Sequence, residues 1–391
     1  MDVVIAGAGI AGLAAALAAA RAGCAVTVYE PVARLAEVGA GLQLGPNAVR
    51  VLADWGLEGA LAACAAFPQA LVARDARSGT ALGRLPLGAR SIQRHGQPYA
   101  TVHRADLHGL LLDAVRATPA IRLRLGQGVC GWAQEGGRVR VGLDGGGQDS
   151  ADLLLGCDGL WGRVRGGWLG DVPPQATGHL AYRGLVPAAD WPAELPADVV
   201  SAWMGPRMHA VTYPVRAGRA FNVVVIVEGE LGGDVQNWSH AAERAELSQR
   251  TGALADGLSA ALDAVPQWLR WPLFERPPLT GAEGQGRGAV ALLGDAAHPM
   301  RPYLAQGAAM ALEDAWTLGR LLARPGAAAT DVVADLARQR WQRNAWVQWR
   351  SRRNGRIFHL APPWSWARNL AMAVGGEHLM DVPRIYGGPP G

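Results

Sequence analysis

The sequence predicts an α/β fold in which a mainly parallel sheet is interrupted by an antiparallel one. Three observations lead to this prediction. Residues 3–30 form a pattern of strand, glycine turn, helix and strand, residues 180–227 are rich in β-forming residues without intervening helices, and after Gly288 a buried strand is again followed by a long helix. A chain that leaves the parallel pattern and later returns to it indicates a second domain inserted into the first.

The N-terminal unit, VVIAGAGIAGLAAALAAARAGCAVTVYE, has the glycine spacing of a dinucleotide-binding turn. Gly7 permits the tight turn after the strand, Gly9 lets the backbone approach a pyrophosphate, and Gly12 lets the helix pack close to the sheet. Free N–H groups at the helix start would face the phosphates, and Glu30, which ends the second strand, is placed to accept ribose hydroxyls. Because strand, helix, second strand and acid all occur in this order, we predict a Rossmann-like domain rather than a signal peptide or membrane span.

Composition limits the possible functions. The chain of 391 residues is half hydrophobic, which is enough for a large core and two lobes. All 37 basic residues are arginine, which excludes a pyridoxal-phosphate Schiff base, a P-loop lysine and a halogenase that uses a lysine amine. The net charge of +4 is spread along the chain, so nucleic acid is not an expected partner. Four scattered cysteines and nine histidines form no metal-binding pattern, and no targeting segment is evident, so we expect no metal, no stable membrane association and a cytoplasmic location.

Several segments follow the first unit in the α/β pattern. GAGLQLGPNAVRVLADWGL predicts a loop that runs into a helix, and HRADLHGLLLDAV predicts another helix with an apolar face. Residues 121–141 alternate in short stretches broken by glycines, which predicts antiparallel strands with turns. The segment ADLLLGCDGLWGRVR then returns to strand, loop and helix.

The middle of the chain is different, because proline and glycine separate β-rich runs there. These runs are Leu180–Val186, Val199–Met204, Met208–Val215 and Phe221–Val227. They predict an antiparallel sheet, and GAVALLGDAAH followed by QGAAMALEDAWTLGRLLA then predicts a buried strand and a long helix. The predicted nucleotide domain, including the C-terminal helices, comprises residues 1–70, 100–175 and 275–391, and the predicted substrate domain comprises residues 71–99 and 176–274.

A tryptophan-rich and arginine-rich stretch, DLARQRWQRNAWVQWRSRRNGR, lies near the C-terminus. Trp341, Ala345 and Trp349 share one face at helical spacing. We expect the tryptophans to pack on the core and the arginines to face solvent. The alternative is a helix that binds a membrane surface or RNA.

Three segments together resemble the class A flavoprotein aromatic hydroxylases, the single-component FAD monooxygenases of the salicylate and 3-hydroxybenzoate hydroxylase type. They are the N-terminal fingerprint through Glu30, CDGLWGRVR at 157–165 and GDAAHPMRPYLAQGAAMALEDA at 294–315, and the resemblance covers essentially the whole chain. It implies that the Rossmann-like domain binds FAD and that NADH or NADPH is a transient electron donor. It also implies insertion of one oxygen atom of O2 into a phenolic or hydroxy-heteroaromatic ring through a flavin C4a-hydroperoxide. The substrate is expected to carry a carboxylate.

Cofactor contacts follow from position and from this resemblance. Asp295 ends a buried strand, where doubly wound sheets bind ligands, and its carboxylate can hold a ribityl hydroxyl. The next helix begins near Gln306, so its positive end can face N1 and the C2 carbonyl of the flavin. The resemblance implies that Arg104 contacts the pyrophosphate and that Asp158 lies between FAD and the nicotinamide donor. As alternatives, Asp295 caps a helix and the Asp-Gly pair is an ordinary turn.

The resemblance also places Gln43 and Val129 along the length of the cofactor. The full set of residues expected to bind the cofactor is Gly7, Gly9, Ala11, Gly12, Glu30, Gln43, Arg104, Val129, Asp158, Asp295, Ala305, Gln306, Gly307 and Ala308.

Candidate substrate residues lie on the inserted sheet. PRMHAVTYPV puts His209, Val211 and Tyr213 on one face of a strand, which should cover the flavin ring. In family members with a His-x-x-x-Tyr pair here, both side chains line the substrate site, so the resemblance implies that His209 activates a phenol and that Tyr213 orients it. The alternative is that both simply pack between sheet and lobe. His298 is expected to brace its loop. Further candidate substrate contacts are Arg183, Arg301, Pro302 and Tyr303. The two arginines are candidate partners for a substrate carboxylate.

The same sequence features are compatible with other functions. A flavin-binding redox sensor without turnover is the main alternative, and a plain NAD-dependent dehydrogenase is another. Within the enzyme class, an epoxidase, a urate hydroxylase-like enzyme and a natural-product tailoring oxygenase share the same frame. We expect a small aromatic substrate and O2 as partners of a monomer or homodimer.

Overall fold

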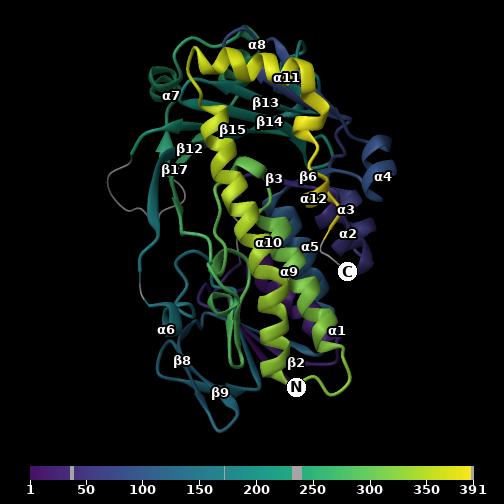
Figure 1. Ribbon diagram of the computed structural model, residues 1–391, viewed down its shortest axis with the longest axis vertical. Helices are drawn as coiled ribbons and strands as arrows, with labels where there is room; N and C mark the ends of the chain where they lie inside the picture. Colours follow the sequence, from purple (N-terminus) through teal and green to yellow (C-terminus); the bar gives the residue numbers. More distant parts are fainter. Residues whose placement is uncertain (36–38, 171, 231–239, 389–391) are drawn as a thin grey trace.

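The computed structural model describes residues 1–35, 39–170, 172–230 and 240–388. Its chain forms a mainly parallel sheet in one lobe and a larger, mostly antiparallel sheet in the other (Figure 1). A long helix, α10 (Ala329–Phe358), runs beside both lobes. The predicted fold class is confirmed.

The parallel sheet has six strands in the order β18-β19-β11-β1-β2-β7. Their bounds are β1 (Asp2–Ala6), β2 (Ala25–Glu30), β7 (Ile121–Leu125), β11 (Leu153–Gly156), β18 (Gly286–Arg287) and β19 (Val290–Leu292). All neighbours are parallel except β18 and β19. The central strands are continuous apolar runs because helices and neighbouring segments bury them.

Three helices pack beside one another in this lobe: α1 (Ile10–Arg21), α5 (Arg104–Arg116) and α9 (Gly307–Leu322). Alanine-rich α1 is almost entirely buried, which lets α9 approach closely: a Cβ on Gly319 would lie 3.1 Å from that of Ala18. This close packing brings the N-terminal turns of α1 and α9 to the same region.

One local prediction is wrong. Residues 121–125 were expected in an antiparallel hairpin, but they form β7, which runs parallel to β2 at the edge of the main sheet. Their alternation reflects a half-exposed edge strand, and alternation alone does not identify the partner strand. The antiparallel sheet that follows is made of β8 (Val129–Glu135), β9 (Arg138–Leu143) and β10 (Gln148–Ala151).

The second lobe contains an eight-stranded sheet in the order β16-β17-β12-β15-β14-β13-β4-β5. The bounds are β4 (Ala70–Asp75), β5 (Ala81–Pro86), β12 (Gln175–Pro187), β13 (Val199–Gly205), β14 (Met208–Val215), β15 (Ala220–Glu228), β16 (His240–Ala242) and β17 (Trp268–Glu275). Its pairs are antiparallel apart from β13 with β4. The sheet thus unites strands from both stretches that were assigned to the substrate domain; the domain boundaries themselves stay a prediction.

The remaining regular elements connect the lobes or cover them. They are β3 (Gly41–Leu44), β6 (Ala100–His103), α2 (Pro46–Asp54), α3 (Glu58–Cys64), α4 (Ala89–His95), α6 (Gly166–Leu169), α7 (Arg244–Thr251), α8 (Asp256–Asp263), α11 (Trp364–Met380) and α12 (Pro383–Tyr386), with short 3₁₀ turns at Ala188–Asp190, Ala282–Gly284, Gly294–Ala296 and Pro302–Leu304.

The orientation predicted for the tryptophan-rich helix is wrong for Trp349, Arg340 and Arg343, although Arg353 and Arg356 face solvent as expected. Trp349 is 52% exposed, whereas Arg340 and Arg343 are only 1% and 9% exposed. Two buried carboxylates on α9, Glu313 and Asp314, are the reason: buried charges need partners, and α10 turns its arginine face toward them.

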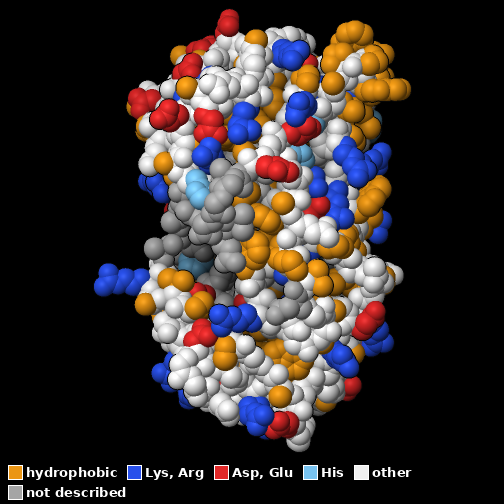
Figure 2. Space-filling model, turned by 90° about the vertical axis from the view of Figure 1, so that its left-hand side faces the viewer, with side chains coloured by type: hydrophobic (Ala, Val, Ile, Leu, Met, Phe, Trp, Pro, Cys, Tyr) orange, Lys and Arg blue, Asp and Glu red, His pale blue; other side chains and the backbone are white. Residues whose placement is uncertain are grey.

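Helix α11 lies against β5 of the large sheet, although its residues were assigned to the nucleotide domain. Gly83 and Gly376 permit this contact, because a Cβ on Gly376 would lie 3.0 Å from the Cα of Gly83. Figure 2 shows hydrophobic side chains gathered at the end of the molecule where α11 lies. The exposed large ones on this helix are Trp364, Trp366, Leu370, Val374 and Leu379. Within the described ranges, no helix combines the length and apolarity that a membrane span requires.

Candidate active site

A cavity lies between the glycine-rich turn and one face of the eight-stranded sheet. The first lobe contributes Gly9, Ala11, Gln43, Arg104, Asp295, Pro302, Ala305, Gly307 and Ala308. The sheet contributes Ala181, Arg183, His209, Val211, Tyr213, Val224, Ile226, Trp271 and Leu273. Segments that are far apart in the sequence therefore meet around one space.

The three glycines of the first turn have different surroundings. Gly7 has φ +100°, and a Cβ there would lie 2.5 Å from the carbonyl oxygen of Cys157. A Cβ on Gly12 would lie 1.9 Å from the carbonyl oxygen of Gly7. Gly9, in contrast, lines the cavity, and a Cβ there would meet nothing within 4 Å. Two glycines thus permit close packing, and Gly9 leaves space for a group that approaches the backbone.

Two of the helices that begin at the cavity, α1 and α9, lack a side-chain cap. Helix α1 follows Gly9, and α9 follows Gln306, whose side chain instead accepts a hydrogen bond from Asn47 Nδ2 at 3.0 Å. Ala305, in the left-handed region with φ +51°, turns the chain so that the start of α9 borders the cavity. Two positive helix ends can therefore face anionic parts of a ligand.

Asp295 lies three residues after the end of β19 and reaches the cavity. Desolvation by the surrounding protein raises the pKa of its carboxyl group, and electrostatic interactions with His298 and Arg104 oppose this effect. A carboxylate, two helix starts and an open glycine turn around one cavity fit FAD, whose hydroxyl, pyrophosphate and flavin groups need these partners.

Some predicted cofactor residues lie outside this cavity lining. Glu30 accepts hydrogen bonds from the N–H groups of Ala8 at 2.7 Å and Val32 at 3.1 Å, at the end of β2. Asp158 accepts one from the N–H of Val164 at 2.9 Å, and burial raises its pKa. Gly7 and Gly12 lie beneath the turn, the Gln306 side chain is buried, and Val129 packs in a separate apolar cluster. The cofactor contacts of these residues stay predictions.

The predicted face of β14 borders the cavity. His209, Val211 and Tyr213 pair with Ile226, Val224 and Asn222 of β15, and all three line the space. The Tyr213 ring packs against Gly41, where a Cβ would lie 2.5 Å from it. Burial raises the pKa of the Tyr213 hydroxyl, which hydrogen-bonds to Gln43.

Arg183 places a buried cation in the same cavity. It is 6% exposed, and its guanidinium lies 4.6 Å from the ring centre of Trp271. Burial, and then the charge of Arg104, lower its pKa to about 10, so it remains charged at neutral pH. An anionic substrate group would be attracted to this position.

Of the other predicted substrate contacts, only Pro302 lines the cavity. Arg301 is held by Glu275, whose two oxygens lie 2.7 and 3.0 Å from its nitrogens. Tyr303 lies behind His209, with ring centres 5.0 Å apart, and its hydroxyl lies 2.6 Å from His179 Nδ1. The structure therefore brings Arg183 and Pro302, but not Arg301 and Tyr303, to the cavity.

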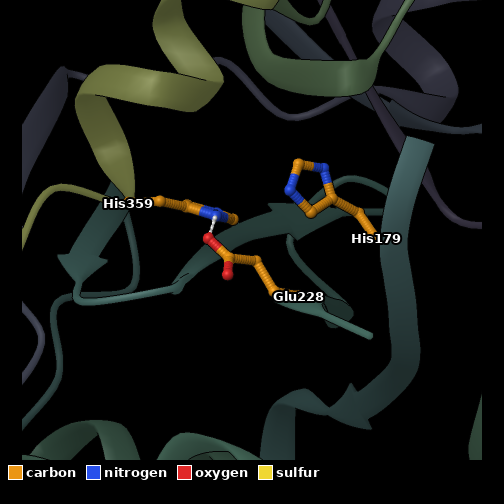
Figure 3. A group of neighbouring side chains, drawn as sticks. All are labelled: His179, Glu228 and His359. Atoms are coloured by element: carbon orange, nitrogen blue, oxygen red, sulfur yellow. Dashed lines mark ion pairs between the residues drawn. The ribbon is translucent and has the colours of Figure 1, made fainter. Parts of the chain in front are cut away.

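A hydrogen-bonded cluster that sequence reasoning missed lies behind His209. His209 Nδ1 is 2.8 Å from Nε2 of His359, and His359 Nδ1 is 3.7 Å from Oε1 of Glu228. Figure 3 shows His359, Glu228 and His179 turned toward one another. His179 stands two residues before Ala181 on β12, so strand alternation could have indicated it. His359 ends a helix about 150 residues from His209, and no local pattern marks it.

The sequence indicated no metal site. In the described residues, His179, Glu228 and His359 hold three potential ligand atoms within 4.8 Å of one another. Positive charge surrounds them, because Arg207 contacts Glu228 at 2.8 Å and Arg301 lies 3.5 Å from His179. This charge disfavours a cation; hydrogen bonds join the three residues to His209, Tyr303 and Arg207 rather than to one another.

The fold and the cavity define a class of proteins in which a dinucleotide-binding sheet and a mostly antiparallel sheet line opposite sides of one cavity. Residues 1–347 match a family model described as FAD binding domain, and the chain belongs to this family. It is 36% identical to 3-hydroxybenzoate 6-hydroxylase of Klebsiella oxytoca over 99% of this chain and 96% of that protein.

Two further comparisons agree with this family. The chain is 36% identical to 3-amino-4-hydroxybenzoate 2-monooxygenase PtnB3 of Streptomyces platensis, over 98% of this chain and 95% of the relative. The crystal structure of HpxO of Klebsiella pneumoniae, complexed with FAD and uric acid, has a TM-score of 0.87 at 27% identity and covers 100% of this chain and 98% of that chain. The chain is accordingly an FAD-dependent, NAD(P)H-consuming monooxygenase that hydroxylates aromatic rings.

Proposed function

We propose that this monooxygenase hydroxylates a phenolic carboxylate of the hydroxybenzoate type. The observation that carries the proposal is the shared cavity: uncapped helix starts and Asp295 lie on one side, and His209, Tyr213 and Arg183 lie on the other. When bound, FAD reduced by NADH or NADPH supplies the activation of O2. The chain itself binds the ring, orients it and removes its phenolic proton.

His209 is the proposed base. A phenolate is a better nucleophile than a phenol, and a neutral imidazole at hydrogen-bond distance can take the proton. Burial lowers the pKa of His209 well below its ordinary value, so the ring is neutral near pH 7. Tyr213, fixed against Gly41, is proposed to orient the ring. Apolar side chains around them exclude water.

Arg183 is the proposed carboxylate partner. Its charge is retained in a buried position beside Trp271, and a guanidinium can bind a carboxylate with two parallel hydrogen bonds. Pro302 borders the space between these groups and the start of α9. This arrangement supports a substrate with a hydroxyl and a carboxylate on one ring.

The test uses the FAD-loaded protein with 3-hydroxybenzoate. We expect this acid to stimulate NADH oxidation and to yield a product heavier by one oxygen atom. His209→Ala should keep FAD bound but lose hydroxylation by about a hundredfold or more. His378→Gln, which changes an exposed histidine on α11, is the matched control. Full coupled turnover of His209→Ala would contradict the proposed base, and no stimulated NADH oxidation across a panel of phenolic acids would favour the redox sensor.

We further propose a cytoplasmic location and a monomeric or homodimeric state. Cell fractionation tests the first, and light scattering on the FAD-loaded protein tests the second. Membrane-bound activity or a larger oligomer would contradict them.

A further inference from the structure

A continuous row of polar side chains connects the cavity with the surface. His209 lines the cavity and is 2% exposed. Its Nδ1 contacts His359, which is 7% exposed and lies beyond the residues that match the family model. His359 in turn faces Glu228, whose side chain is 36% exposed (Figure 3). Burial therefore decreases stepwise from the cavity outward.

The contacts determine which nitrogen of each histidine ring faces the cavity side and which faces the surface side. Because Nδ1 of His209 faces His359, only its Nε2 can reach a molecule in the cavity. Because Nε2 of His359 faces His209, its Nδ1 faces the Glu228 carboxylate. A carboxylate favours an N–H on the nitrogen that it faces, so His359 carries its proton on Nδ1, and its bare Nε2 accepts the N–H of His209 Nδ1. These tautomers leave Nε2 of His209 bare, as a base requires.

Burial and neighbouring groups keep both rings neutral. Burial, then the nearby His359 and His179, lower the pKa of His209. Burial, then His179, lower the pKa of His359 to about 4, while Glu228 opposes this shift. A neutral imidazole can accept a proton on one nitrogen while it releases one from the other. Among the residues that the structure describes, the titratable and charged groups that face the two rings or their carboxylate are His179, Arg207, Glu228, Arg301 and Tyr303.

We infer that His359 and Glu228 form a proton path that carries the phenolic proton from His209 to solvent. The inference rests on the proposed function. The phenol O–H bond breaks as an N–H bond forms at Nε2 of His209, and the proton on its Nδ1 passes to Nε2 of His359. The proton on Nδ1 of His359 then passes to Glu228, which releases it to water. Transfer in the opposite direction, when a product hydroxyl is re-formed, restores both rings. His359 and Glu228 act through His209 and do not touch the substrate.

The last step needs a small movement. The 3.7 Å between His359 Nδ1 and Glu228 Oε1 is an ion-pair distance, whereas a hydrogen bond needs about 2.7–3.2 Å. Glu228 is the partly exposed member, and rotation of its side chain closes this gap. Its other oxygen is held by Arg207 at 2.8 Å, which keeps the carboxylate near the path.

The first test needs no substrate. In FAD-loaded protein with nitrogen-15-labelled histidine, NMR should show His209 and His359 each protonated on Nδ1, with the signals assigned by His209→Gln and His359→Gln. In Glu228→Gln, the Nδ1 preference of His359 should weaken. A proton on Nε2 of His359 in the unaltered protein would overturn the inference, whatever the substrate.

The second test follows the phenol directly. After a rapid rise in pH, the absorbance of 3-hydroxybenzoate bound to the FAD-loaded protein should report phenolate formation. His359→Gln keeps an acceptor near His209 but cannot pass a proton on, so the rate should fall on the order of tenfold to a hundredfold. Imidazole added to His359→Gly should restore part of the lost rate, which a merely structural role would not allow. His378→Gln should match the unaltered protein.

The outcomes separate the two proposals. An unaltered rate in His359→Gln, while the starting protein forms phenolate, would overturn the path but leave the proposed function intact. No phenolate in the starting protein would count against the proposed substrate, and the histidine NMR would then decide on the path by itself.

Discussion

Arg340 on α10 binds Asp314 on α9, with its Nε 2.8 Å from Oδ1 of the carboxylate. The other oxygen of Asp314 accepts hydrogen bonds from the Gly294 N–H at 3.1 Å and from His298 Nε2 at 2.6 Å. The long C-terminal helix is thereby tied to the loop that presents Asp295 to the cavity. His298 braces this loop, as its position suggested. Nearby charges lower the pKa of Asp314 against the effect of burial, so the carboxylate stays ionised.

Arg340→Met should destabilise the protein by about 3–5 kcal/mol, because it leaves buried carboxylates without their partner. Chemical denaturation of the FAD-free protein measures this loss. Arg338→Met removes a surface pair with Asp335 on the same helix and should cost less than about 1 kcal/mol. Equal losses in the two variants would contradict a structural role for the buried pair.

Gly9→Ala should weaken FAD binding, whereas Gly12→Ala should lower the stability of the fold. Gly9 has φ −71°, and an added methyl group would enter only the cavity, so the fold should persist while FAD binds at least about tenfold more weakly. Gly12→Ala would force a methyl group onto the Gly7 carbonyl, with an expected loss of about 3 kcal/mol or more. Denaturation and flavin titration separate these effects. Unchanged FAD affinity in Gly9→Ala would argue against a phosphate at this turn.

Arg183→Gln should weaken binding of a carboxylated substrate specifically. Loss of a charge-assisted hydrogen bond of about 1.5–3 kcal/mol corresponds to a rise in KM of roughly ten- to a hundredfold. The kcat value should change less, because the carboxylate is bound equally in ground state and transition state. 3-Hydroxybenzaldehyde, which lacks the carboxylate, is the control substrate. An equal rise in KM for both compounds would indicate that Arg183 acts in cofactor binding or in folding and not in binding the carboxylate.

The stability of the protein should fall in mild acid. Burial and His179 lower the pKa of His359 to about 4, whereas an unfolded chain has a histidine pKa of about 6.5. Between these values the unfolded chain binds more protons, so the stabilisation is complete above about pH 6.5 and is lost as the pH falls toward about 4. His359→Gln should show a shallower decline in unfolding free energy over this range, and His378→Gln should not. An unchanged slope in His359→Gln would contradict this assignment.

Local patterns were sufficient for part of the site. The spacing of Gly7, Gly9 and Gly12 predicted the turn, although only the Gly12 contact, with the Gly7 carbonyl, is local; the Gly7 contact with Cys157 joins distant segments. Strand alternation predicted that His209 and Tyr213 share a face, since successive side chains point to opposite sides. Their proposed roles, like the contacts of Glu30 with a ribose, stay predictions, and His209→Ala tests the first of them.

The sequence by itself determined the fold class and the glycine turn, because these depend on short-range periodicity and steric rules, and three of its motifs carried the resemblance that predicted the family. Only the tertiary structure decided which strand pairs with residues 121–125, which face of α10 is buried, and that His359 stands behind His209. Those outcomes depend on charge compensation and hydrogen bonds between segments that are distant in the sequence, and no local pattern contains them.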